Sequence, residues 1–120
     1  MIAFSTLAFP DASLASAVSL GRRWGYAGVE LRLIDGQLID PSMPAADRAR
    51  VKRTLAGLPV VAVDTSIRLT GDDPGAQLGR FLELASDWEA PLVRVFGGAL
   101  AAEGRVRQEQ LLADWMEVDE

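Results

Sequence analysis

Charged side chains occupy alternate positions in three apolar segments of the chain. In Gly28–Leu33 and Val60–Leu69 the apolar residues fall on one parity and the polar residues on the other. Because alternate residues of a strand point to opposite faces, one face of each predicted strand carries the polar groups. These groups are Glu30, Arg32, Asp64, Ser66, Arg68 and Arg94.

The three arginines outnumber the two carboxylates in this set, although the whole chain carries a net charge of −5. Guanidinium groups bind phosphate and carboxylate through two parallel hydrogen bonds, so the set favours a small anionic substrate. The alternative is a network of ion pairs that satisfies itself and binds nothing, which is common in proteins.

Several kinds of chemistry are excluded by composition. The chain has no histidine and no cysteine, so it supplies no imidazole base, no Ser–His pair, no cysteine nucleophile and no disulfide. We expect no metal site and no cofactor held by this chain alone. A net charge of −5 also disfavours nucleic acid as a partner, because phosphate neutralisation needs a surplus of cations.

The chain is predicted to be a single domain, residues 1–120, with 49% hydrophobic and 24% charged residues. Its first residues lack a positively charged leader, and no segment has the roughly 20 apolar residues that span a membrane. We therefore expect no membrane partner and a cytoplasmic location.

Four strand-like segments begin about 30 residues apart. They are Ile2–Phe9, Gly28–Leu33, Val60–Leu69 and Leu92–Phe96. Helical periodicity follows each one: a first helix capped by Asp11 and stopped at Gly25, a second from Pro44 to Gly57, a third from Asp73-Pro74 to Trp88, and a fourth over Gln108–Met116. This order predicts an α/β fold of four consecutive βα units with a parallel sheet.

Polar residues on one parity favour half of a (β/α)8 TIM barrel over a flat sheet, which would be apolar on both faces. In such a barrel the polar side chains would face the lumen near its mouth. The apolar helix positions, with Trp24, Trp88 and Trp115 among them, are predicted to be core. The pair Gly97-Gly98 either brings backbone N–H groups near a ligand or forms a simple turn.

Four motifs carry a resemblance to a known family: FSTLAFP (4–10), RRWGYAGVELR (22–32), VDTSIRL (63–69) and APLVRVFGG (90–98). In this order and spacing they resemble the first half of a sugar phosphate isomerase/epimerase of the xylose-isomerase-like TIM-barrel family. The resemblance implies a (β/α)8 barrel that isomerises or epimerises a sugar, in many members with a divalent metal. It implies substrate-side roles for Glu30, Arg32 and Arg94, with Asp64 and Arg68 as further candidates.

The chain departs from that family in length. A complete barrel takes about 250 residues, and the family's metal ligands, which include a histidine, come from the second half. No metal ligand and no catalytic residue is therefore assigned, and we expect the chain alone to lack metal-dependent isomerase activity.

Three functional hypotheses remain open. The first is the N-terminal half of a sugar or sugar phosphate isomerase/epimerase, without complete catalytic equipment of its own. The second is a non-catalytic binding or assembly module that pairs with itself, as a homodimer, or with a second half-barrel. The third is a small doubly wound receiver or nucleotide binder, which the absence of a glycine-rich first loop disfavours.

Overall fold

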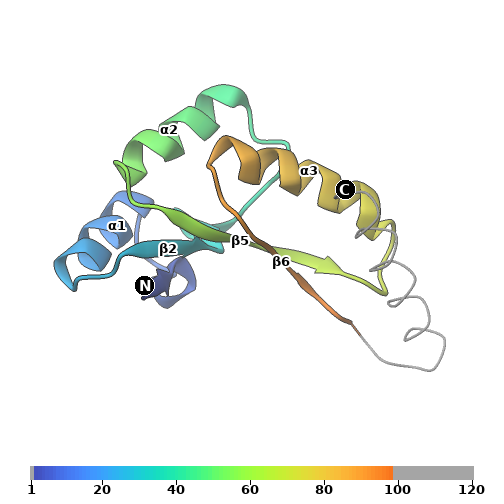
Figure 1. Ribbon diagram of the computed structural model, residues 1–120, viewed down its shortest axis with the longest axis horizontal. Coiled ribbons are helices and arrows are strands. Elements are labelled where there is room, and N and C mark those ends of the chain that lie inside the picture. The colour runs from blue at the N-terminus through green and yellow to red at the C-terminus, as the bar shows by residue number, and fades with distance from the viewer. Residues whose placement is uncertain (1, 99–120) are drawn as a thin grey trace.

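The protein, described here from a computed structural model covering residues 2–98, is built on one four-stranded parallel sheet (Figure 1). Its strands lie in the order of the chain, β1-β2-β5-β6, without a reversal. Their bounds are β1 Ala3–Ser5, β2 Gly28–Leu31, β5 Val60–Arg68 and β6 Val93–Phe96. The predicted α/β fold with consecutive βα units is confirmed for this part of the chain.

Three helices connect the consecutive strands, and α2 and α3 lie along one side of the sheet in Figure 1. They are α1 Leu14–Arg23, α2 Ala45–Leu55 and α3 Pro74–Asp87. Parallel crossovers are almost always right-handed, so strands added in one direction place their helices on one face. The predicted fourth helix, Gln108–Met116, lies outside the described residues.

One face of the sheet, formed by alternate residues of each strand, is buried against these helices. Val29, Leu31 and Val63 are completely buried, and they belong to the same apolar cluster as the helix residues. That cluster includes Leu14, Ala17, Val18, Val51, Leu55, Phe81, Leu84, Ala85 and Trp88. The opposite parity, which carries the candidate site, faces away from the helices.

The first strand is shorter than predicted, because polar side chains end it. Ser5 Oγ accepts a hydrogen bond from Leu7 N, and a 3-10 turn, η1, follows over Thr6–Ala8. Thr6 is buried, and its Oγ1 accepts from the backbone N–H groups of Arg32 (3.0 Å) and Leu33 (2.9 Å). The predicted strands Ile2–Phe9 and Gly28–Leu33 are therefore corrected to Ala3–Ser5 and Gly28–Leu31.

A small hairpin lies between β2 and α2, where the sequence predicts no strand beyond Leu33. Its strands are β3 Leu33–Ile34 and β4 Gln37–Leu38, paired antiparallel. Asp35 and Gly36 between them have φ angles of 53° and 77°. An Asp-Gly pair favours this two-residue turn, because both central residues need positive φ.

The helix ends differ from prediction in their caps. Ser13, in place of Asp11, caps α1, since its Oγ accepts from Ser16 N at 3.1 Å. Asp73 does precede α3, with Pro74 in the first turn, but its side chain forms no capping hydrogen bond. The second helix begins after Pro44 and stops before Gly57, as the sequence predicts. Ala56 and Gly57 have left-handed conformations at its end.

Two of the predicted core residues are exposed. Trp24 lies just past the end of α1 and is 62% exposed, and Leu82 on α3 is 44% exposed. Trp88 is in the core as predicted, where its Nε1 donates to the Arg48 carbonyl oxygen at 3.1 Å. Trp115 lies outside the described residues. Within residues 2–98 no helix is long and apolar enough to cross a membrane.

Candidate functional site

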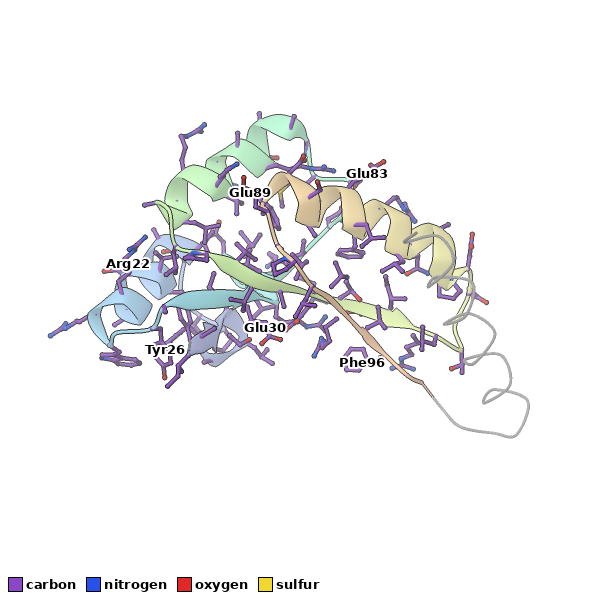
Figure 2. All side chains as sticks on the ribbon, in the orientation of Figure 1. Arg22, Tyr26, Glu30, Glu83, Glu89 and Phe96 are labelled. Atoms are coloured by element: carbon purple, nitrogen blue, oxygen red, sulfur yellow. The ribbon has the colours of Figure 1, made fainter. Side chains whose placement is uncertain are left out.

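The register of the sheet gathers four of the predicted site residues. Asp64 on β5 lies directly opposite Arg94 on β6, while Glu30 on β2 lies opposite Ala62, two residues before Asp64. Arg32 directly follows the last residue of β2 and lies beside the part of β5 that contains Asp64. Figure 2 shows Glu30 and Phe96 on the side of the sheet away from α2 and α3.

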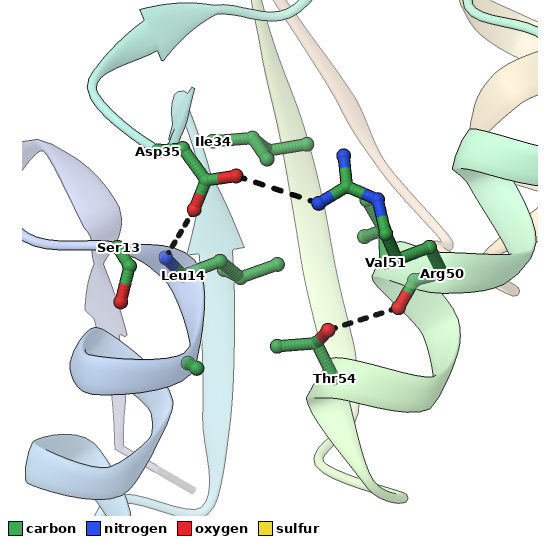
Figure 3. A pocket seen from close by; sticks show the side chains of 8 residues that line it. Ser13, Leu14, Ile34, Asp35, Arg50, Val51 and Thr54 are labelled. Carbon is green, nitrogen blue, oxygen red and sulfur yellow. Dashed lines mark hydrogen bonds and ion pairs between the residues drawn. The ribbon is translucent and has the colours of Figure 1, made fainter.

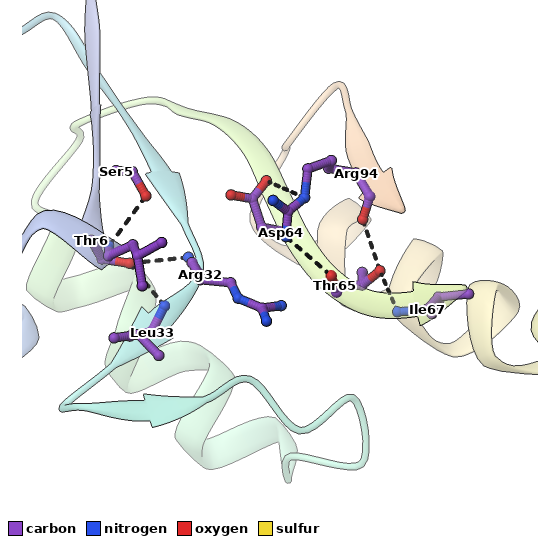
Figure 4. A network of polar contacts seen from close by, with 9 residues as sticks. Ser5, Thr6, Arg32, Leu33, Asp64, Thr65, Ile67 and Arg94 are labelled. Carbon is purple, nitrogen blue, oxygen red and sulfur yellow. Dashed lines mark hydrogen bonds and ion pairs between the residues drawn. The ribbon is translucent and has the colours of Figure 1, made fainter. Parts of the chain in front are cut away.

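Asp64 is the buried centre of this group and only 4% exposed. Its Oδ1 lies 3.7 Å from Arg94 Nε, an ion pair too long for a hydrogen bond (Figure 4). The strands hold Arg94 in place by other contacts: its Nη2 donates to the Thr65 carbonyl oxygen, and Thr65 Oγ1 donates to the Arg94 carbonyl oxygen. The position of Arg94 is thus set by β5 and does not depend on a direct bond to Asp64.

Burial raises the pKa of Asp64 to about 7, from an ordinary value of 3.8. The neighbouring Glu30 carboxyl adds to this rise, first through a hydrogen bond to the protonated form and then through its charge. Arg94 and Arg32 act in the opposite direction and offset only part of the effect. Asp64 therefore keeps its proton up to near-neutral pH.

The two arginines converge on the ring of Phe96. The Cζ atom of Arg94 lies 4.4 Å from the ring centroid, and that of Arg32 lies 5.9 Å from it. Both are within the range of cation–π attraction. The ring is 42% exposed, so it offers a partly open apolar surface beside two cations. Phe96 is not among the residues that the sequence predicts for the site, although its parity with Arg94 could identify it.

A cavity of about 140 Å³ lies next to Asp64, on the side opposite Arg94. It lies beside the part of β5 that extends past the end of β2. The hairpin and α3 close it. The sequence predicts α3 but not the hairpin, because it indicates no strand between Leu33 and the second helix. The cavity is lined by Arg32, Leu38, Ile39, Asp64, Thr65, Ser66, Ile67, Gln77 and Phe81.

The remaining predicted site residues are less closely placed. Ser66 lines the cavity and is exposed. Arg68 is exposed at the end of β5, opposite Phe96 in the register, and forms no ion pair with the rest of residues 2–98. Four of the five predicted substrate-binding residues, Glu30, Arg32, Asp64 and Arg94, therefore lie together, and Arg68 stands apart from them. Their role in binding stays a prediction.

A second cavity, of about 230 Å³, lies between α1, α2 and β3 (Figure 3). Its charged groups serve the fold. Asp35 Oδ1 accepts a hydrogen bond of 2.7 Å from the backbone N–H of Leu14, the first residue of α1. Its Oδ2 lies 3.7 Å from Arg50 Nη1. Because Asp35 already fills the anionic position at this helix end, we assign the cavity no ligand.

Among the described residues, no group of three or more histidine, cysteine, aspartate or glutamate side chains could hold a metal ion. Comparison of the chain with protein-family models, with curated proteins and with solved structures finds no match.

Proposed function

We propose that this chain is the first half of a (β/α)8 barrel of the sugar phosphate isomerase/epimerase type, and that its polar sheet face holds part of a sugar or sugar phosphate. The observation that carries this proposal is the strand order, in which four parallel strands follow one another without reversal. A doubly wound sheet reverses its order at the ligand crevice. In a barrel, ligands bind at the carboxyl ends of the strands. Arg32 and Phe96 lie at the carboxyl ends of β2 and β6, whereas Asp64 and Arg94 lie within their strands.

Each group of the site has a separate task in this proposal. The guanidinium groups of Arg32 and Arg94 orient anionic or hydroxyl oxygens of the substrate. Glu30 accepts from sugar hydroxyl groups, and protonated Asp64 donates a hydrogen bond. The exposed ring of Phe96 packs against the C–H groups of the sugar. In the family that the sequence resembles, a divalent metal held by the second half stabilises charge that develops on the sugar oxygens.

Binding of a hexose 6-phosphate, measured by titration calorimetry, tests this proposal. Arg94→Met is expected to weaken binding at least about tenfold, because it removes a charge-assisted contact. Arg53→Met is the matched control: Arg53 is exposed on α2, away from the polar face of the sheet, and its replacement should leave affinity unchanged. Absence of binding by the wild-type chain, or equal loss in both variants, would contradict the proposal.

A second function, as an assembly module, is favoured by the exposed apolar residues on the same sheet face. Leu92 is 64% exposed and Phe96 42% exposed, and four strands cannot close a barrel. Open strand edges and exposed apolar surface promote association. We therefore expect two copies of this chain to form a homodimer of half-barrels. The alternative partner is a different chain that supplies the second half-barrel. A cytoplasmic location stays a prediction of the sequence.

Gel filtration with light scattering checks this assembly. The wild-type chain is expected at twice its mass, and Leu92→Asp should shift it toward the monomer, because a charge would be buried in the interface. Leu82→Asp is the control, since Leu82 is also exposed but lies on α3, on the covered side of the sheet. A monomeric wild-type peak with concentration-independent melting would exclude the dimer.

A further inference from the structure

The polar contacts around Asp64 are incomplete. Asp64 Oδ1 and Arg94 Nε are both buried, lie 3.7 Å apart, and have no hydrogen-bond partner within residues 2–98. Buried polar atoms nearly always have partners, and an unpaired one is costly. A buried carboxyl in this position is therefore more stable with a proton than without one.

Asp64 also faces the cavity on the β2 side. Four further polar side chains line that cavity, those of Arg32, Thr65, Ser66 and Gln77. Thr65 Oγ1 already donates to the Arg94 carbonyl oxygen, and Gln77 Nε2 donates to the Asp72 carbonyl oxygen. The guanidinium of Arg32 and the hydroxyl of Ser66 can donate hydrogen bonds to a bound group. The other walls are uncharged: Leu38 from the hairpin, Ile39 just after it, Ile67 from β5 and Phe81 from α3. The cavity thus presents hydrogen-bond donors, with Asp64 as its one carboxyl group.

The charge of the site depends on whether this carboxyl group holds its proton. The charged groups that act on Asp64 are Glu30 and Arg32 from the β2 side and Arg94 from β6. With a proton on Asp64, the two guanidinium groups outnumber the one remaining carboxyl group, that of Glu30, and the site is positive. Without this proton the positive and negative charges of the site balance, and the carboxylate of Asp64 faces the cavity.

We propose that this cavity binds the phosphate group of the substrate, and that binding is coupled to the uptake of one proton by Asp64. This inference rests on the proposed function and adds that the substrate is phosphorylated. A protonated Asp64 donates a hydrogen bond to a phosphate oxygen, whereas an ionised Asp64 repels it. By linkage, a bound anion must in turn raise the pKa of Asp64.

The composition of the chain makes this coupling measurable. Because the chain contains no histidine, no other side chain has an ordinary pKa between 5 and 8. Sulfate is a suitable probe, since it resembles a phosphate dianion but does not titrate in this range. Its binding can be followed by NMR, through the Nε–H signals of Arg32 and Arg94 and the side-chain carboxyl carbon of Asp64.

Sulfate affinity is expected to fall by roughly 30-fold between pH 5.5 and pH 8.5, as the protonated fraction of Asp64 decreases. Saturating sulfate should move the midpoint of the Asp64 titration to higher pH. Asp64→Asn, which cannot ionise, should bind sulfate with an affinity that changes less than about twofold over this range. Asp11→Asn, an exposed control, should keep the wild-type dependence. An α-amino group also titrates near pH 8, and both variants retain it.

Glu30→Gln provides a second and independent variant. It removes the carboxyl that raises the pKa of Asp64, so the fall in sulfate affinity should begin at a lower pH. Absence of sulfate binding at pH 5.5, or binding that does not change with pH, would overturn this inference. Binding of the hexose 6-phosphate in that case would leave the proposed function standing, whereas its absence would remove both.

Discussion

Replacing Gly21 with alanine should destabilise the protein by about 1–3 kcal/mol, although alanine ordinarily favours a helix. Gly21 lies within α1 and faces the sheet, where a Cβ atom would overlap the ring atoms of Phe4. That ring cannot move aside freely. It is 6% exposed and packs against Phe9 and Tyr26, with centroid distances of 5.9 Å and 5.5 Å.

Gly79→Ala is the matched control, because Gly79 is also a helical glycine. On α3 its Cβ would meet nothing within 4 Å. This variant should be more stable than the wild type by roughly 0.5–1 kcal/mol, the usual gain from replacing a helical glycine. Urea denaturation of both variants measures the difference. If both variants gained the same free energy of unfolding, a Cβ atom at position 21 would not clash with the ring of Phe4.

The second large effect concerns the dependence of stability on pH. The pKa of Asp64 is raised from 3.8 to about 7 in the folded protein, so the folded state holds its proton more tightly than the unfolded chain does. The stability that this proton provides is complete below pH 3.8 and is lost as the pH rises through 7. A tenfold change in proton affinity corresponds to about 1.4 kcal/mol, so the loss of stability amounts to a few kcal/mol.

Asp64→Asn should therefore be more stable than the wild type at pH 8.5, by up to about 3 kcal/mol, and close to it at pH 5. The amide keeps the size of the side chain but cannot become charged. Denaturation curves at the two pH values, with Asp11→Asn as the control, measure this difference. If the wild type were equally stable at both values, Asp64 would not titrate as a buried group.

Local patterns in the sequence determined the βα order and most of the core. Leu14, Ala17, Val18, Val51, Leu55 and Trp88 are buried as their helical spacing predicts. This succeeds because the periods of helix and strand are properties of the chain itself, and the apolar face must turn toward the sheet. The same parity placed Glu30, Asp64 and Arg94 on one face.

Positions at the ends of elements were less predictable, because tertiary contacts compete there with local preference. The side chain of Thr6 bonds to the backbone of Arg32 and Leu33, and β2 stops where those bonds form. Trp24 continues the apolar spacing of α1 but lies beyond its last turn and is exposed. The end of β2 thus depends on a residue distant in sequence, whereas the end of α1 at Trp24 is made by bonds to Leu20 and Arg22 within the same helix.

Residue types and strand parity established which side chains could form the site, whereas the packing of the elements established how those side chains act on one another. No spacing along the chain reveals that Asp64 has a buried oxygen 3.7 Å from Arg94, or that Glu30 raises the pKa of Asp64. The cavity beside Asp64 exists because β5 extends past the end of β2, while the hairpin and Gln77 close the gap. Strand register, relative strand length and burial arise only when the elements pack together, and these three set the pKa and the charge of the site.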